Sequence, residues 1–95
     1  MNLEWDDAKN ELNIRKHGFD FADAWSVIFG SLPFYARLDT RVDYGEDRWQ
    51  GIGMLNGAVV VVIVFTEPRT TAVRIISMRK ATKEERKLYE KRIKN

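Results

Sequence analysis

Ala58-Val59-Val60-Val61-Val62-Ile63-Val64-Phe65 is the longest apolar run of the chain, and as a strand it would have no polar face. Its β-branched residues favour a strand. A strand that is apolar on both sides must lie inside a sheet and be covered on both sides. Asn56-Gly57 comes directly before it, and this dipeptide favours a tight type I′ hairpin. We therefore predict that residues 58–66 pair with residues 48–55 as antiparallel neighbours.

Strand and helix patterns alternate on either side of this hairpin. Further strands are predicted at 3–5, 34–38 and 72–80. Helices are predicted at about 6–17 and 20–29, from caps at Asp6 and Asp20, and at 82–93, from the capping box Thr82-Lys83-Glu84-Glu85. Gly18, Gly30, Pro33 and Pro68 are placed at element boundaries.

This order predicts a single domain over residues 1–95 with an α+β fold. The sheet is expected to be mainly antiparallel. The two N-terminal helices should cover one face of it. The other face should be left for the C-terminal helix and for function.

Composition limits the class of protein. Hydrophobic residues make up 44% and charged residues 32%, which is typical of a globular chain and excludes a disordered one. The absence of cysteine excludes disulfides and thiolate chemistry and fits a reducing compartment. The N-terminal residues lack the pattern of a signal peptide, and the longest apolar run is too short to span a bilayer as a helix. We expect a cytoplasmic protein.

Charge is unevenly distributed along the chain. Residues 1–50 contain 6 Lys and Arg against 10 Asp and Glu, whereas residues 51–95 contain 10 against 4. A basic half suggests that the chain binds a polyanion such as RNA or DNA. The alternative is a solvated surface with excess lysine on the last helix.

The first helix carries a polar stripe of Lys9, Asn13, Lys16 and His17, which share one helical face. His17 is the only histidine, and its unperturbed pKa lies near neutral pH. The helix C-terminus favours its imidazolium form. The stripe could therefore serve acid–base chemistry. Alternatively, His17 only caps the helix and the lysines face solvent.

Two further clusters could bind an anion. Glu46 and Arg48 are two residues apart at the start of a strand, so their side chains share a face. They could act as a general base beside an arginine that binds phosphate. Alternatively, they form an ordinary ion pair. On strand 72–80, simple alternation places Arg79 with Val73, Ile75 and Ser77, and Arg74 with Ile76, Met78 and Lys80. Together with Tyr44 and Trp49, these arginines could bind a flexible single strand through phosphates and stacking. Alternatively, the arginine stems only cover apolar surface.

Several kinds of site are missing from the sequence. With one histidine, no cysteine and no D-x-D or H-x-x-x-H spacing, the chain is expected to bind no metal. Gly51-Ile52-Gly53 lacks the third glycine of a dinucleotide fingerprint, and no phosphate-binding loop or serine nucleophile elbow occurs. We expect no cofactor.

Three segments in register resemble the BrnT-like toxin family. Residues 5–18 match W-D-x-x-K-x-x-x-N-x-x-K-H-G, and residues 45–49 match its G-E-x-R segment. Residues 74–81 match R-I-I-S-A-R-x-A, with the charged helix behind them. The likeness covers nearly the whole chain. It departs at Met78, where the family usually has alanine, and at Phe19, where it usually has a small aliphatic residue.

This resemblance implies a RelE-like fold and a metal-free endoribonuclease that cuts RNA and arrests growth. It also implies a BrnA-like ribbon-helix-helix antitoxin as partner, and operator DNA contacted only through that antitoxin. The alternatives are a nucleic-acid- or protein-binding module of the same fold without catalysis, and a toxin-like fold that has lost activity.

The chemistry of RNA cleavage suggests roles for the matching residues. RNA supplies its own nucleophile, the 2′-OH, so cleavage needs a base, an acid and cations around the phosphate. The expected catalytic residues are His17, Glu46, Arg48 and Arg79, with Glu46 or His17 as base and His17 or a lysine as acid. The expected RNA-binding residues are Lys9, Lys16 and Arg74.

Overall fold

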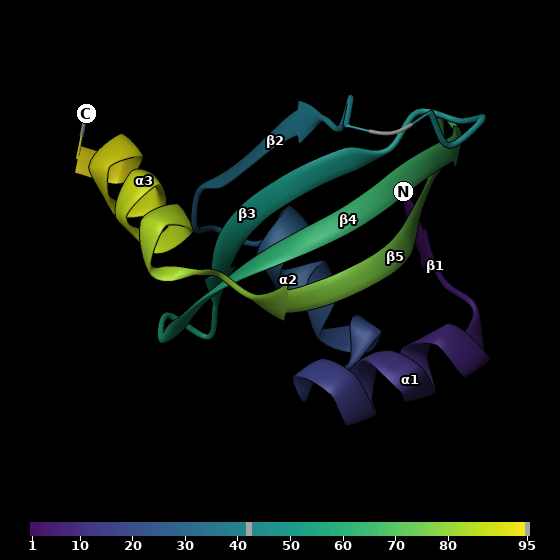
Figure 1. Ribbon diagram of the computed structural model, residues 1–95, viewed down its shortest axis with the longest axis horizontal. Coiled ribbons are helices and arrows are strands. Elements are labelled where there is room, and N and C mark those ends of the chain that lie inside the picture. Colours follow the sequence, from purple (N-terminus) through teal and green to yellow (C-terminus); the bar gives the residue numbers. More distant parts are fainter. Residues whose placement is uncertain (42, 95) are drawn as a thin grey trace.

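The fold is built on one five-stranded sheet with the strand order β1-β5-β4-β3-β2 (Figure 1). The computed structural model describes residues 1–41 and 43–94. The strands are β1 (Asn2–Glu4), β2 (Phe34–Leu38), β3 (Trp49–Leu55), β4 (Val59–Arg69) and β5 (Ala72–Lys80). The apolar run lies in β4, the middle strand, as predicted. The sheet is mixed, because β1 pairs with β5 in parallel while the other pairs are antiparallel.

The predicted hairpin between β3 and β4 is confirmed. Asn56 and Gly57 have φ angles of 55° and 66°, and the Ala58 N–H donates to the Leu55 carbonyl at 3.0 Å. Two successive residues with positive φ are the signature of a type I′ turn. The placement of Pro68 at an element boundary was wrong, since Pro68 lies within β4. It lies at a register shift between Thr66 and Arg69, where a residue without an N–H is tolerated.

The helices are α1 (Asp7–His17), the 3-10 helix η1 (Phe21–Asp23), α2 (Ala24–Phe29) and α3 (Lys83–Lys94). Asp6 caps α1, accepting from the Ala8 and Lys9 N–H groups at 2.9 and 3.1 Å. The single helix predicted at 20–29 is divided into η1 and α2, because the backbone N–H groups of Asp23 and Ala24 donate to carbonyls three residues earlier.

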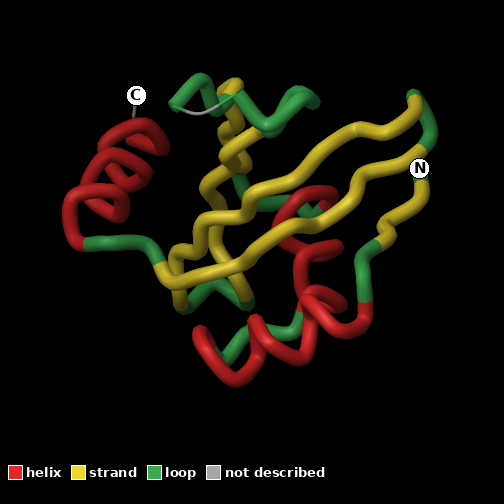
Figure 2. The backbone as a smooth tube through the Cα atoms, turned by 45° about the vertical axis from the view of Figure 1, so that its right-hand side comes forward, coloured by secondary structure: helices red, strands yellow, loops and turns green. Residues whose placement is uncertain are grey.

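Helices η1 and α2 pack on one face of the sheet, α1 lies along β5, and α3 stands apart from them (Figure 2). Burial of apolar side chains between these helices and the sheet forms the core. Phe21, Ala24 and Val27 pack there against the sheet residues Val61, Ile63, Phe65, Val73, Ile75 and Met78.

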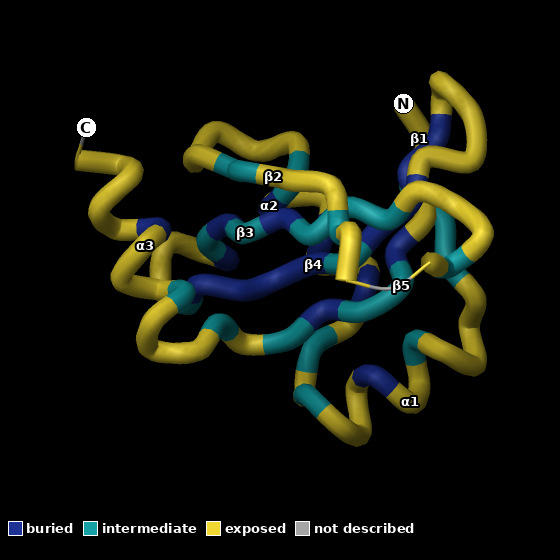
Figure 3. The backbone as a smooth tube through the Cα atoms, turned by 45° about the horizontal axis from the view of Figure 1, so that its top comes forward, coloured by how far each residue is buried: buried dark blue, intermediate teal, exposed yellow. Residues whose placement is uncertain are grey.

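The second face of β4 is also buried where α3 lies beside it. Val60 and Val62 are 4% and 2% exposed. Tyr89 of α3 is 1% exposed, and its hydroxyl donates to the Pro33 carbonyl at 2.6 Å, which ties the helix to the start of β2. Apart from this contact, α3 is exposed along most of its length (Figure 3).

A β-bulge in β5 changes which side chains share a face. Val64 pairs with Ser77 and Phe65 pairs with Ile75, so Ile76 is an extra residue on β5. Because Ile75 and Met78 both pack in the core, Arg79 lies on the face opposite the helices. The alternation predicted from the sequence, which separated Arg74 from Arg79, was therefore wrong. The bulge puts both arginines on one face.

Asn13 attaches α1 to the sheet. Its amide donates to the Met78 carbonyl at 2.9 Å, and its side-chain oxygen accepts from the Met78 N–H at 3.1 Å. The amide also donates to the Phe19 carbonyl at 3.0 Å. Strand β1 pairs only with residues 72–74 of β5, so Asn13 satisfies backbone groups that a longer neighbouring strand would otherwise satisfy.

We predict that Asn13→Ala lowers the free energy of unfolding by about 2–4 kcal/mol, because it leaves buried N–H and carbonyl groups of Met78 without partners. Urea denaturation measures this change. Leu12→Ala is the control, since Leu12 is 60% exposed in the same helix and its truncation should change stability little. Equal stabilities for the two variants would contradict the role given to Asn13.

Candidate functional site

The face of the sheet opposite α1 and α2, called here the open face, collects polar side chains from three strands. The strand registers align Arg37 with Gln50, Gln50 with Val64, and Val64 with Ser77 across the sheet. Arg79 pairs with Val62 in the same way, two residues further along β5 than Ser77. Because directly paired residues point to the same side of a sheet, these side chains form one surface.

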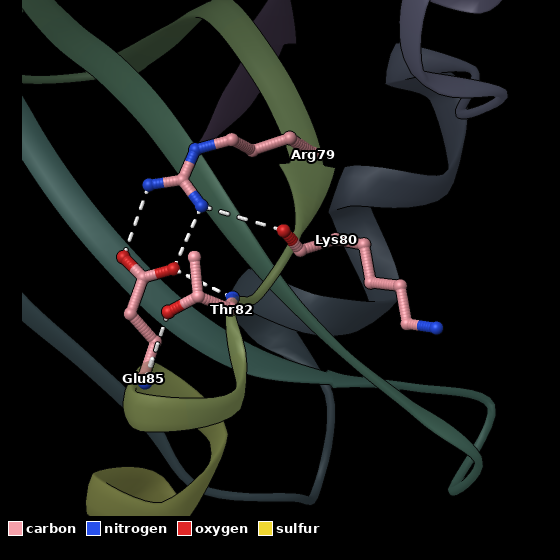
Figure 4. A network of polar contacts seen from close by, with 4 residues as sticks. All are labelled: Arg79, Lys80, Thr82 and Glu85. Carbon is pink, nitrogen blue, oxygen red and sulfur yellow. Dashed lines mark hydrogen bonds and ion pairs between the residues drawn. The ribbon is translucent and has the colours of Figure 1, made fainter.

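Arg79 is held at the centre of a polar network (Figure 4). Its Nη1 and Nη2 atoms donate to the two carboxylate oxygens of Glu85 at 2.7 and 3.0 Å, and Nη1 also contacts the Lys80 carbonyl at 3.3 Å. Glu85 in turn accepts from the Thr82 N–H at 2.8 Å, while its own N–H donates to the Thr82 hydroxyl at 3.2 Å. The predicted capping box is therefore confirmed, and its Glu85 also binds Arg79.

The ionisation of this pair follows from its geometry. The hydrogen bond from Arg79, with a smaller contribution from Thr82, lowers the pKa of Glu85 to about 2. Hydrogen bonding to Glu85 raises the pKa of Arg79 above its ordinary value. Both groups are therefore charged at neutral pH.

The connection between β2 and β3 carries two further arginines, Arg41 and Arg48. Arg41 binds Asp39 through two hydrogen bonds of 2.9 and 2.8 Å, and this contact lowers the pKa of the Asp39 carboxyl to about 2. The charge of Arg41 acts on Arg79, opposing the larger effect of Glu85 on its pKa. The guanidinium carbon of Arg48 lies 4.1 Å from the ring centroid of Tyr44.

Arg48 is the least satisfied of these arginines. Its Nε is buried and has no hydrogen-bond partner among the residues that the structure describes. The ion pair between Glu46 and Arg48, which the sequence left open as an alternative, does not form. A guanidinium held only by an aromatic ring keeps its capacity to bind an anion.

A groove of about 160 Å³ lies between α3 and the strands β2 and β3. Arg92 stacks over the Tyr35 ring at 4.4 Å, and Tyr35 meets the Tyr89 ring edge-on at 5.8 Å. Glu85 also lines this groove, so it adjoins the Arg79 network. The groove therefore combines aromatic, cationic and amide groups, the last from Gln50.

Glu46 and Arg74 line a second depression, of about 350 Å³, beside the end of β4. Glu46 is exposed. Arg74 donates to Glu4 at 3.0 and 3.2 Å, and Glu4 also binds Arg69 at 2.7 Å. These two hydrogen-bonded arginines lower the pKa of Glu4. The structure thus brings Glu46 together with Arg74.

The polar stripe of α1 lies on the other side of the sheet. Lys9 and Lys16 are exposed, and His17 is half-buried in the last turn of the helix. Asn13 attaches α1 to the backbone of β5 at Met78, and His17 makes no hydrogen bond or ion pair with Arg48 or Arg79, so the structure does not bring these groups together.

Some residues of the open face were missed by the sequence reasoning. Arg37 could have been found, because alternation within 34–38 places it with Tyr35 on a single face. Arg41 and Arg92 gave no local signal, since only the chain's tertiary path brings them to this surface. Glu85 was interpreted as part of a helix capping box and of the charged helix behind the family signature, and no contact with Arg79 was predicted.

The open face has the chemistry of a surface that binds a phosphodiester chain. Guanidinium groups bind phosphate oxygens through paired hydrogen bonds, and aromatic rings stack on exposed bases. Within residues 1–41 and 43–94, no three His, Cys, Asp or Glu side chains gather into a potential metal site. In the same residues, no helix is long and apolar enough to cross a membrane.

We predict that the stabilisation by Glu85 depends on pH. Its pKa in the folded chain is about 2, below the ordinary 4.5, so the unfolded chain binds the proton first as pH falls. The contribution is complete above about pH 4.5 and is lost towards about pH 2. Urea denaturation should show Glu85→Gln less stable than wild type by about 1–2 kcal/mol at neutral pH, allowing for partial solvent screening.

This difference should vanish near pH 2. Glu90→Gln is the control, because Glu90 is exposed and lies 3.7 Å from Arg86. A difference between wild type and Glu85→Gln that stays constant from neutral to acid pH would contradict the ion pair.

Comparisons with known proteins agree with the resemblance noted in the sequence. A family model for the ribonuclease toxin BrnT of type II toxin–antitoxin systems matches residues 5–85. The structure is similar to the crystal structure of the Brucella abortus ribonuclease toxin BrnT, with 35% sequence identity and a TM-score of 0.68. That match covers 87% of this chain and 99% of the other. A search among curated proteins gave no match. The chain belongs to the BrnT family of ribonuclease toxins of type II toxin–antitoxin systems.

Proposed function

We propose that this chain is a metal-independent endoribonuclease that cleaves RNA in the cytoplasm and arrests growth until its antitoxin neutralises it. Family membership supports the class of activity. The observation that carries the proposal for this chain is the gathering of Arg37, Arg48, Arg74 and Arg79 on or beside the open face, near the half-buried rings of Tyr35 and Tyr44. The RelE-like architecture stays a prediction.

The proposed reaction is attack of the RNA 2′-OH on the adjacent phosphate. Negative charge grows on the non-bridging oxygens in the transition state, and positioned guanidinium groups stabilise it. Arg48 and Arg79 are proposed for this role. Arg48 retains a buried, unsatisfied Nε, and Arg79 has a fixed orientation. A metal ion would otherwise supply comparable charge stabilisation.

The proton transfers are assigned to the remaining expected residues. Glu46 and His17 are proposed as base and acid, each contributing roughly 10²–10⁴-fold to the rate. Glu46 lines the depression that also contains Arg74, so a phosphate bound by Arg74 would lie near this carboxylate. His17 lies on the opposite side of β5, so its participation requires RNA to pass around the edge of the sheet. Lys9 and Lys16 are proposed as contacts along that path.

The proposed partner is a BrnA-like ribbon-helix-helix antitoxin, with operator DNA bound only through it. An acidic or amphipathic segment of the antitoxin could occupy the cationic surface and exclude RNA. Charge complementarity would accelerate this association, whereas apolar contact would set its lifetime.

A binding module without catalysis is the second candidate. The open face is compatible with it, because stacking and phosphate contacts suffice to bind RNA. Turnover of RNA by the purified chain, freed from its partner, separates the two functions. Growth arrest on expression without antitoxin separates an active toxin from an inactive toxin-like fold.

We predict that Arg48→Ala and Arg79→Ala each abolish growth arrest and lower RNA cleavage by about 10²-fold or more, because each removes a donor to the developing charge. Induction of each variant without antitoxin, with matched expression, measures toxicity. Arg15→Ala is the control, since it removes the same charge from an exposed position of α1 that lines neither the groove nor the second depression. Full toxicity of both open-face variants would place the active site elsewhere.

We also predict that cleavage continues in excess EDTA and leaves 2′,3′-cyclic phosphate or 3′-phosphate ends. The reason is that the 2′-OH is the nucleophile and guanidinium groups neutralise the phosphate. Mass spectrometry of the fragments of a short RNA identifies the ends. Activity that EDTA abolishes and Mg²⁺ restores would contradict this mechanism.

A further inference from the structure

Arg79 uses only part of its hydrogen-bonding capacity within the protein. A guanidinium has five N–H donors. Three of those on Arg79 have partners, namely two to Glu85, at 2.7 and 3.0 Å, and one to the Lys80 carbonyl at 3.3 Å. The Nε–H and the second Nη2–H have no partner among the described residues.

The two remaining donors lie on the same edge of the guanidinium. Glu85 binds the end of the group, between Nη1 and Nη2, while Lys80 takes the outer hydrogen of Nη1. The planar geometry leaves Nε–H and the outer Nη2–H parallel along the other side. That spacing matches two oxygens of a phosphate.

Glu85 also fixes the direction of this edge. Its carboxylate is held by the Thr82 N–H at 2.8 Å, and its backbone N–H is held by the Thr82 hydroxyl. The Arg79 guanidinium is therefore tied to the start of α3 rather than free to rotate. Arg79 and Glu85 side chains are only 31% and 27% exposed.

We propose that the Nε/Nη2 edge of Arg79 is a binding site for one phosphodiester group of single-stranded RNA, and that Glu85 is the positioning residue that orients this edge. The inference deepens the proposed function and rests on it for the identity of the substrate. Glu85 touches neither the phosphate nor the reacting atoms; it acts through Arg79.

The surroundings of the site favour an anion there. Arg41 lies close enough for its charge to affect the ionisation of Arg79. The groove between α3, β2 and β3 begins at Glu85, so a nucleotide attached to the bound phosphate could extend towards Tyr35 and Arg92. A phosphate on the free edge of Arg79 would leave the contact with Glu85 intact.

The first test compares Glu85→Gln with Thr82→Ala. Glutamine can still accept from the Thr82 N–H through its amide oxygen, but it cannot pair with both Nη atoms of Arg79. Thr82→Ala removes the hydroxyl cap and leaves the ion pair. We expect Glu85→Gln to lower kcat/KM for a short single-stranded RNA by about 10- to 100-fold through misplacement of Arg79, and Thr82→Ala to change it by about twofold or less.

Thermal unfolding of both variants controls for a structural effect. If Glu85→Gln cleaves as fast as wild type, Glu85 does not position Arg79 and the proposal is wrong. If it cleaves faster, Glu85 masks Arg79, which also overturns the proposal. If Thr82→Ala loses as much activity as Glu85→Gln, the effect belongs to the helix cap, and the positioning role is again excluded.

The second test uses sulfur substitution of one non-bridging oxygen at the cleaved phosphate. Sulfur is a poorer acceptor, so the wild-type rate should fall with one of the two diastereomers. Arg79→Ala and Glu85→Gln should lose most of this sensitivity, because the contact that sulfur weakens is already absent or misplaced. Equal sensitivity in all three proteins would show that Arg79 does not hold that oxygen.

A binding measurement separates this proposal from the proposed function. Fluorescence anisotropy with a single-stranded 2′-deoxy oligonucleotide measures phosphate binding without cleavage, because the probe lacks the 2′-OH nucleophile. We expect Glu85→Gln to raise the Kd about tenfold and Thr82→Ala to leave it nearly unchanged. Absence of RNA cleavage by wild type, with this binding pattern kept, would overturn the nuclease and keep the phosphate site. Equal Kd values for wild type and Glu85→Gln would overturn the site.

Discussion

Burial of β4 on both faces is the constraint on which the rest of the structure depends. A strand composed of Val60 to Phe65 cannot lie at an edge or face water on either side. The hairpin at Asn56-Gly57 gives it one neighbour, and β5 gives it the other. Helices η1 and α2 cover one face, whereas α3 covers only part of the second. The uncovered part of that second face becomes the open face.

The bulge at Ile76 determines what this open face contains. Without the extra residue, Arg74 and Arg79 would point to opposite sides of β5. With it, Val73, Ile75 and Met78 all pack in the core, and both arginines lie opposite the helices. One backbone irregularity therefore fills the core and collects the positive charge on a single surface. This arrangement agrees with the frequent occurrence of bulges beside functional sites.

The elements of the fold were largely predictable, because each rests on a local rule. Asp6, Gly18, Asn56-Gly57 and the Thr82–Glu85 capping box mark boundaries by their own backbone chemistry. Pairing of β1 with β5 and extension of β4 through Pro68 were not predictable, since they depend on contacts distant in sequence.

The arrangement of the candidate site was less predictable than the fold. The residues Arg48, Arg74 and Arg79 were identified from sequence, but the common face of Arg74 and Arg79 depends on a bulge that alternation alone does not reveal. The ion pair of Glu85 with Arg79 could not be predicted, because a glutamate at this position of a capping box looks the same in sequence whether or not it also binds an arginine. Asn13 was grouped with the charged residues of its helix stripe. Its amide instead completes the edge of β5, which only the packed structure shows.

The central proposal is that the arginines of the open face bind the phosphate groups of RNA, with α1 adding only contacts along the path around β5. Nuclear magnetic resonance of the full chain with a non-cleavable RNA oligonucleotide tests it most directly, because arginine Nε–H signals report each guanidinium separately. The signals of Arg37, Arg48 and Arg79 are predicted to shift on titration. Unchanged signals from these three arginines, with shifts confined to α1 around Lys9 and Lys16, would contradict it.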